Sequence, residues 1–323
     1  MFPNINVFMK KFFFLFVLVS MVTFSSGAQT GKDVDGDGTI DLTDVSLLIN
    51  FIICLSSDAG SFDITGDGVV DMSDVSMLVD YVLNPPKPLA NETFTVNGVS
   101  FDMILVEGGT FRMGATEEQG SDVMSDEKPV HEVSVSSYLI GKTEVTTELW
   151  KAVLGWNPSD FRGTNLPVEC VAWSNCQSFI SELNKLTGRK FRLPTEAEWE
   201  FAARGGNKSK GYKYSGSNSI DEVAWYSGNS NSRTQPVGTK QPNELGIYDM
   251  TGNVSEWCSD YYSSSYYSES PVLNPTGPES GTTRSKRGGN WMNSESFCRV
   301  SRRGEYSPGD INYNLGLRLC LSE

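Results

Sequence analysis

Acidic side chains recur at fixed spacing in two short stretches near the start of the chain. The first stretch runs from Asp33 to Asp44, and the second repeats its spacing from Asp63 to Asp74. Calcium takes six to eight oxygen ligands, and a loop with ligands at positions 1, 3, 5, 7 and 12 wraps them round one ion, with glycine at position 6 for the turn. Gly38 and Gly68 stand at that position. Two solvated acidic turns without metal are the alternative. We expect two calcium sites, whose ligands are Asp33, Asp35, Asp37, Thr39 and Asp44 in one and Asp63, Thr65, Asp67, Val69 and Asp74 in the other.

Thiols and a single imidazole are the other side chains that could do chemistry. His131 is the one histidine of the chain, which excludes zinc sites built on paired histidines. No serine lies in a G-x-S-x-G turn, the arrangement that exposes the nucleophile of many hydrolases. The sequence leaves disulfide pairing open among Cys54, Cys170, Cys176, Cys258, Cys298 and Cys320.

The N-terminal segment has the order of a secretory signal. A basic pair at 10–11 precedes an apolar run at 12–24, and small residues follow at 26–28. The run is shorter than the roughly 20 residues that a membrane-spanning helix needs. We therefore expect cleavage of 1–28 and a secreted or surface-attached chain without a membrane span. A retained anchor is the alternative.

Charge and composition limit the classes of molecule that the chain is expected to bind. Asp and Glu number 40 against 26 Lys and Arg, so the formal net charge is −14. Such a surface repels phosphate backbones, so nucleic acid is not expected as a partner. A hydrophobic content of 38%, with 11% aromatic residues, is enough for a packed core.

The elements that must position these residues fall into two parts. Each acidic stretch runs into an apolar helix, so 29–84 is one module, 85–92 is a Pro-rich linker, and 93–323 is a larger domain. In the larger domain a strand is expected at 101–106, and helices at 144–153, 173–186 and 195–203. Much of the remainder lacks a clear period, which indicates an α+β domain with little regular secondary structure.

Paired calcium loops, each followed by one helix, resemble the dockerin module. The resemblance covers about 31–84. It implies two bound calcium ions and a cohesin domain of a surface or scaffold protein as the partner.

The larger domain resembles the formylglycine-generating enzyme family, also called the sulfatase-modifying factor domain. The resemblance rests on MILVEGGTFRMG (103–114), GKTEVTTELWKAVLG (141–155), RLPTEAEWEFAARGG (192–206), NELGIYDMTGNVSEWCSD (243–260), RGGNWMNSESFCRVSRR (287–303) and LGLRL (315–319). It implies an irregular fold related to C-type lectin-like domains. Buried bonds from Arg192 to Glu196 or Glu198 are expected to fix its loops. The core tryptophans are expected at Trp173, Trp199, Trp257 and Trp291.

The resemblance also suggests metal sites. Asn253 and Glu256 match a calcium-binding turn, with an Asn-capped turn without metal as the alternative. The family's enzymes bind Cu(I) through two cysteines. Cys298 matches the second, but Asn293 stands at the first, and Asn290 replaces a serine that faces the substrate. An amide is a poor ligand for Cu(I).

The polar and aromatic residues near the C-terminus are candidates for a ligand-binding face. Some relatives are lectin-like binding proteins, and this segment has the composition of antibody loops. We expect a ligand-binding face, for a glycan or a protein, made of Asn293, Ser294, Phe297, Tyr306, Asp310, Asn312 and Tyr313. The leading hypothesis is a binding protein without catalysis. The alternatives are a copper- and oxygen-dependent oxidase acting on a sulfatase cysteine through Cys298, and a purely structural subunit.

Overall fold

The chain divides into two compact units, 1–88 and 89–323, in a computed structural model. The structure describes residues 33, 37, 39–54, 64, 71–83 and 89–322. The signal-like segment and the prolines of the linker lie outside the described residues, as do Asp35, Asp63, Thr65, Asp67 and Val69 of the expected calcium loops.

The small unit contains two helices that start alike. These are α2 (Leu42–Cys54) and α3 (Met72–Leu83). In the first turn of α2, Asp44 accepts a hydrogen bond of 2.7 Å from the amide of Asp41, and Asp74 accepts the equivalent bond from Asp71 in α3. Both carboxylates are fully buried. The internal repeat of the sequence is therefore also a repeat of hydrogen bonds.

A small apolar core joins the two helices. It is made of Ile40, Val45, Leu48, Val75, Leu78 and Val82. The apolar residues recur at helical spacing, so that each helix turns one stripe inward. A core of this size stabilises a module only weakly.

A five-stranded antiparallel sheet forms the centre of the large unit. Its strands, in spatial order, are β1 (Glu92–Val96), β2 (Val99–Val106), β5 (Tyr138–Gly141), β11 (Cys320–Leu321) and β6 (Phe191–Arg192), and every neighbouring pair is antiparallel. Successive side chains of a strand point to opposite faces. In β5, Leu139 belongs to one hydrophobic core, and Tyr138 and Ile140 belong to another. The sheet is therefore buried on both faces.

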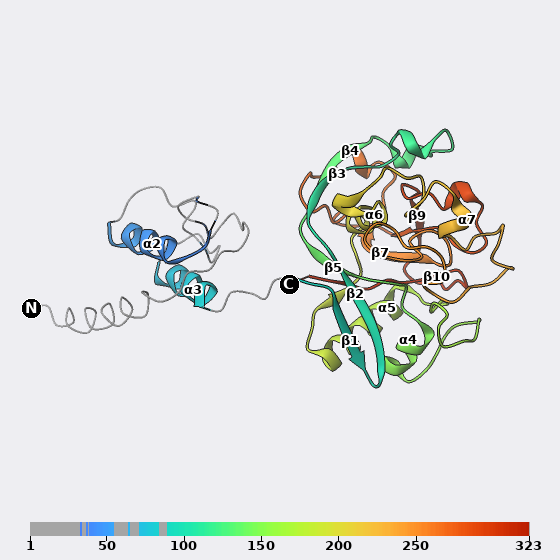
Figure 1. Cartoon of the computed structure of the whole chain (residues 1–323), viewed down its shortest axis with the longest axis horizontal. Helices are drawn as coiled ribbons and strands as arrows, with labels where there is room; N and C mark the ends of the chain where they lie inside the picture. The colour runs from blue at the N-terminus through green and yellow to red at the C-terminus, as the bar shows by residue number, and fades with distance from the viewer. Residues whose placement is uncertain are drawn as a thin grey trace, which may run out of the picture. The chain divides into compact units, whose positions relative to one another are not determined.

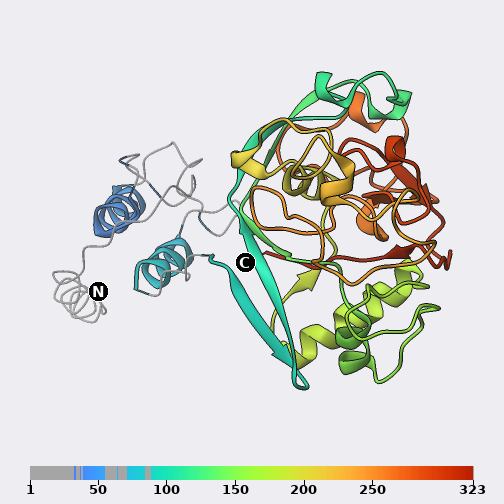
Figure 2. The same cartoon turned by 45° about the vertical axis from the view of Figure 1, so that its right-hand side comes forward.

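Two helices pack in the hydrophobic core that contains Leu139. They are α4 (Thr147–Leu154) and α5 (Trp173–Thr187). Figure 1 shows them beside β1 at one end of the large unit, with β3 (Gly109–Met113) and β4 (His131–Val135) at the other end, and Figure 2 shows the same separation. The helix expected at 144–153 starts later because the Thr146 hydroxyl caps the amide of Leu149, while the Val145 amide donates to the Leu317 carbonyl.

The hydrophobic core that contains Tyr138 and Ile140 also includes side chains of α6 (Glu196–Ala203) and of a four-stranded sheet. The strands are β10 (Leu315–Gly316), β7 (Ser255–Tyr261), β8 (Arg284–Arg287) and β9 (Gly304–Tyr306), with β10 parallel to β7 and the other pairs antiparallel. The expected capping box of Thr195 and Glu198 starts α6. A short helix, α7 (Ile220–Val223), completes the unit.

Buried ion pairs hold the irregular segments together. Arg192 makes the expected pair with Glu198, through contacts of 2.7 and 2.6 Å. Glu196 pairs instead with two arginines from distant segments, Arg287 and Arg303. Each guanidinium also donates to backbone carbonyls of loops, so these pairs satisfy groups that a larger sheet would have satisfied.

The tryptophans differ in burial. Trp199 and Trp257 are fully buried, and Trp291 is nearly so. Trp173 is only partly buried, which corrects the expectation of a core position. The guanidinium carbon of Arg284 lies 4.1 Å from the centroid of the Trp173 ring. Trp173 Nε1 donates a hydrogen bond to the Cys258 carbonyl.

Candidate functional site

A hollow of about 350 Å³ opens beside the C-terminal strands of the large unit. It is lined by Asp126, Tyr262, Lys286, Arg287, Gly289, Asn293, Phe297, Arg302, Arg303, Gly304, Glu305 and Tyr306. We call it the C-terminal hollow. Three of the residues expected to bind ligand, Asn293, Phe297 and Tyr306, meet here. Phe297 is 44% exposed, whereas Tyr306 is partly buried.

The other expected binding residues do not line this hollow. The Tyr313 ring packs against Trp291, with centroids 5.7 Å apart, and the Trp291 ring meets Phe161 edge-on. Asp310 accepts from the Ser307 amide within a turn, and the Asn312 carbonyl accepts from the Cys170 amide. Ser294, Asp310, Asn312 and Tyr313 are absent from the lining of the C-terminal hollow, so the seven expected residues do not share one hollow. A single binding face stays a prediction.

Cys298 lies beneath the C-terminal hollow and is fully buried. It belongs to a small apolar cluster whose other buried members are Tyr214, Ile220, Val223 and Ala224. Burial raises the pKa of this thiol to about 12, so it carries its proton at neutral pH. A protonated, buried thiol is a weak nucleophile, and binding of copper would have to displace its proton.

The position of the family's other catalytic cysteine is on the wall of the C-terminal hollow, but it holds the amide of Asn293. Asn290 is buried, and its side chain donates to the Ser255 hydroxyl. Cys258 belongs to a different core, and burial raises the pKa of its thiol well above the usual value. The residues present therefore do not fit a two-thiolate copper site.

The described cysteines form no disulfide. Cys170, Cys176, Cys258, Cys298 and Cys320 are all free thiols in the part of the chain that the structure describes. The pairing that the sequence left open is therefore answered for these five residues, which are unpaired in the structure. The side chain of Cys54 lies outside the described residues.

A group of two carboxylates and one thiol lies at Asp160, Glu169 and Cys170. Burial raises the pKa of Glu169, and burial together with the Glu169 carboxylate raises the pKa of Cys170 to about 12. A thiol that keeps its proton can donate it to the neighbouring carboxylate. Glu169 Oε1 accepts from the Phe161 amide at 2.9 Å, whereas its buried Oε2 has no hydrogen-bond partner within the described residues.

The cations of the C-terminal hollow differ in how they are balanced. Arg287 and Arg303 are buried and paired with Glu196, and Arg287 also contacts Glu200. Lys286 forms no ion pair within the described residues, and its Nζ lies 4.7 Å from the centroid of the Tyr306 ring. Burial, with the nearby charge of Arg302, lowers its pKa to about 8.

Three buried carboxylates surround one guanidinium elsewhere in the large unit. Glu256 accepts from Arg318 through both carboxylate oxygens, and it also accepts from Trp199. Glu144 and Asp249 lie near it. Burial raises the pKa of Asp249 to about 6, and burial and the neighbouring carboxylates raise that of Glu144 well above its usual range.

The calcium site expected at Asn253 and Glu256 stays a prediction. The Asn253 oxygen accepts from the Gln235 amide, and its NH₂ group donates to Glu144. The carboxylate oxygen without a hydrogen-bond partner is Asp249 Oδ1, which is buried. Asp249 fits a cation here better than Asn253 does, since three carboxylates share one arginine.

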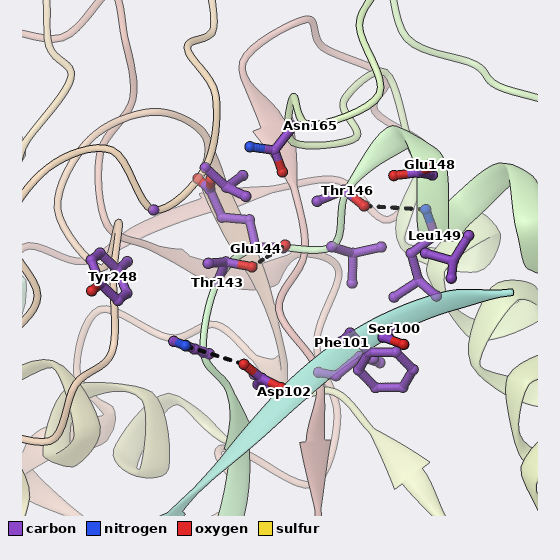
Figure 3. A pocket seen from close by; sticks show the side chains of 17 residues that line it. Ser100, Phe101, Asp102, Thr143, Glu144, Thr146, Glu148, Leu149, Asn165 and Tyr248 are labelled. Atoms are coloured by element: carbon purple, nitrogen blue, oxygen red, sulfur yellow. Dashed lines mark hydrogen bonds and ion pairs between the residues drawn. The ribbon is translucent and has the colours of Figure 1, made fainter. Parts of the chain in front are cut away.

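A second hollow, of about 460 Å³, lies between β2, the segment at 141–149 and the loop at 237–248. Figure 3 shows Thr143, Glu144, Thr146 and Glu148 on one side and Asp102 and Tyr248 on others. Lys142 closes an ion pair of 3.1 Å with Asp102. This hollow could not be predicted from the sequence, because its residues come from separate segments that form no motif.

Comparisons with known proteins agree with the fold. The family model described as the sulfatase-modifying factor enzyme 1-like domain matches residues 91–322, and the dockerin type I domain matches 31–87. A protein named chaperone protein LppX, from Paenibacillus barcinonensis, is 36% identical over 70% of this chain and 91% of its own length. The formylglycine-generating enzyme of Streptomyces coelicolor is 37% identical, and the match covers 50% of this chain and 54% of that enzyme.

Comparison with solved structures supports the same fold for the large unit. Treponema denticola variable protein 1 superposes with a TM-score of 0.65 and 35% identity, covering 73% of this chain and all of that one. PvdO from Pseudomonas aeruginosa gives a TM-score of 0.63 and 26% identity, with the same coverage. The large unit therefore has the mixed helix-and-strand fold of these proteins. No helix in the described part of the chain is long and apolar enough to cross a membrane.

Proposed function

Because this chain belongs to the sulfatase-modifying factor enzyme 1-like family and carries a dockerin type I domain, we propose that it is an exported binding protein. In this proposal a cohesin-bearing scaffold or surface protein holds the small unit. The large unit binds a glycan or protein ligand through the C-terminal hollow and catalyses no reaction.

The observation that carries this proposal is the pair of residues at the copper position. Asn293 offers an amide on the wall of the C-terminal hollow, and Cys298 is buried with a pKa raised to about 12. Copper(I) needs soft thiolate ligands. A hollow whose wall offers an amide where a copper site would need a thiolate is suited to binding.

The dockerin domain supports the arrangement of the whole chain. Dockerin domains bind calcium and dock on cohesins. The match to residues 31–87 contains both acidic loops of this chain. We propose that each loop holds one calcium ion, and that the signal-like segment at 1–28 directs export.

A third calcium ion belongs to the proposal, in the large unit. Asp249 and Glu256 would hold it, and its charge would offset the repulsion among the buried carboxylates. Calcium should then raise the melting temperature of the large unit, and Asp249→Asn should abolish that response. Asp310→Asn, on an exposed turn away from the cluster, is the matched control.

The second candidate function is an oxidase of the formylglycine-generating type. The 37% identity to the Streptomyces coelicolor enzyme favours it. The 36% identity to a protein named as a chaperone favours a protein ligand bound without oxidation.

Copper titration separates the two functions. The wild-type protein should not compete for Cu(I) with a thiolate-strength chelator, and it should form no formylglycine in a sulfatase-type peptide under oxygen. Asn293→Cys should at most raise the affinity for copper, because Asn290 also differs from the family's pattern. Oxygen-dependent turnover that disappears in Cys298→Ser would establish the oxidase and overturn the binding proposal.

A further inference from the structure

The lysine of the C-terminal hollow occupies a position built for it. Lys286 lies in β8, opposite Gly304 of β9. A side chain at position 304 would have its Cβ 3.0 Å from Lys286 Cε and 3.4 Å from Nζ. The lysine stem therefore lies across the bare glycine, and its Nζ reaches the face of the Tyr306 ring.

Arg302 is the second cation that is only loosely held. Its guanidinium lies 5.2 Å from the centroid of Phe297. The nearest carboxylate oxygen, from Asp126, is 3.6 Å away, which is longer than a hydrogen bond. The other Asp126 oxygen accepts from the Tyr262 hydroxyl at 2.7 Å.

Both cations contact an aromatic ring; Lys286 forms no ion pair within the described residues, and Arg302 has one carboxylate contact, with Asp126 at 3.6 Å. A ring face attracts a cation through its quadrupole, so the net charge remains. Arg287 and Arg303, by contrast, face the Glu196 carboxylate at direct ion-pair distance. The one further carboxylate on the wall is Glu305, which is exposed and accepts from the Thr283 hydroxyl.

The pKa of Lys286 agrees with this difference. Burial and the charge of Arg302 lower it, and no carboxylate among its main influences raises it again. A lysine that is partly desolvated, close to a second cation and without a carboxylate partner has a strong reason to bind an anion.

We propose that the C-terminal hollow binds a carboxylate or sulfate group carried on a ring. Lys286 and Arg302 hold the anionic group, and the exposed Phe297 contacts the ring. The inference rests on the proposed binding function and adds the chemical class of the ligand. It also distinguishes this chain from an oxidase, whose substrate would be a cysteine peptide.

Calorimetric titration of the full chain tests the inference. The probes are glucuronate, benzoate and inorganic sulfate, with glucose as the neutral match to glucuronate. Glucuronate and benzoate separate a sugar ring from an aromatic one. At least one of the two should bind more tightly than sulfate, glucose should not bind, and added salt should weaken binding.

Substitutions locate the site. Lys286→Met keeps the apolar stem and removes the charge, so it should weaken anion binding about tenfold or more, equivalent to about 1.4 kcal/mol. Lys210→Met is the matched control, because Lys210 is exposed and also faces a ring, that of Tyr212, outside the hollow. Arg302→Gln gives a second reading if Lys286→Met unfolds.

The outcomes separate this inference from the proposed function. Equal binding of glucose and glucuronate, unchanged in Lys286→Met but lost in Phe297→Ala, would overturn the anionic class and leave ligand binding in place. Failure of all three anions to bind at millimolar concentration would overturn the anionic inference itself. Copper-dependent turnover would overturn the proposed function independently.

Discussion

At the scale of single residues, the C-terminal hollow depends on a glycine pair that brings the backbone close to a thiol. Gly288 and Gly289 both have positive φ, of 95° and 70°. A Cβ on Gly289 would lie 2.7 Å from Cys298 Sγ and 2.8 Å from the Phe297 carbonyl. The turn that places Asn293 and Phe297 thus needs both the missing side chain and the left-handed backbone.

We predict that Gly289→Ala destabilises the large unit by about 2 kcal/mol or more, from the combination of backbone strain and overpacking. Gly309→Ala is the matched control, since nothing lies within 4 Å of its Cβ and its backbone is not left-handed. Thermal denaturation of both variants measures the difference. Equal melting temperatures would contradict the packing argument.

The residues of the copper position show what sequence alone could reach. The substitution at Asn293 is visible in the sequence, and so is Cys298. The burial of that thiol is not, because it depends on α7 and the segment at 214–226, which pack over it from elsewhere in the chain. The same holds for the surroundings of Lys286 and Arg302. Lys286 forms no ion pair within the described residues, and Arg302 has only a long contact, of 3.6 Å, with Asp126.

At the scale of elements, the helices of the small unit each begin at a buried carboxylate. Asp44 and Asp74 cap the amides of Asp41 and Asp71, and they are also the twelfth residues of the two calcium loops. Buried carboxylates need a compensating charge. Helix formation and calcium binding should therefore occur together.

We predict that residues 29–86, made alone, lose their helical circular dichroism in chelator and regain it with calcium. Asp44→Ala should abolish the recovery at moderate calcium concentration, whereas Ser76→Ala, exposed on α3, should not. Helicity that persists in chelator would count against a module folded by calcium.

The start of α6 gives the large unit a dependence on pH. Asp260 of β7 accepts from the Glu196 amide at 3.0 Å. Burial and the charge of Glu196 raise the pKa of Asp260 to about 7. A carboxyl whose pKa is higher in the folded state stabilises the fold most below its unfolded value of 3.8, and that contribution is lost as pH rises toward 7.

We therefore predict that the melting temperature falls between pH 5 and pH 7.5, and that Asp260→Asn removes part of the fall. The asparagine oxygen can still accept from the Glu196 amide. Glu196 has the opposite sign, because burial opposes ionisation but Arg303 and Arg287 lower its pKa to about 2. Its contribution is lost only in strong acid. A melting temperature that rises equally with pH in both proteins would refute the assignment to Asp260.

Local patterns in the sequence predicted individual helices and strands better than they predicted contacts between distant segments. The capping box at Thr195 and the strand at 101–106 could be predicted because their determinants lie within one turn or one alternating run. The partners of Glu196 could not, since Arg287 and Arg303 follow it at a distance that no local pattern spans. For the same reason the spacing of Asn253 and Glu256 does not predict that Asp249 lies near Glu256 and Arg318, because only the fold brings these side chains together.

At the scale of the whole molecule, the apolar cores divide as the family matches do. The core of the small unit contains residues from 40 to 82, and both large cores contain only residues from 94 onward. A core confined to one unit can form without the other. Attachment and ligand binding should therefore be separable properties of the chain.

The last prediction follows from this division. Residues 89–323, made alone in saturating calcium, should melt within a few degrees of the corresponding transition of the full chain. This part should bind the same anionic probes with unchanged affinity, because Lys286, Arg302 and Phe297 all belong to it. It should no longer be retained on an immobilised cohesin, whereas the full chain should be retained and released by chelator. A truncated chain that is still retained would move the docking surface to the large unit. A large drop in melting temperature would show instead that the small unit stabilises the fold that carries the ligand.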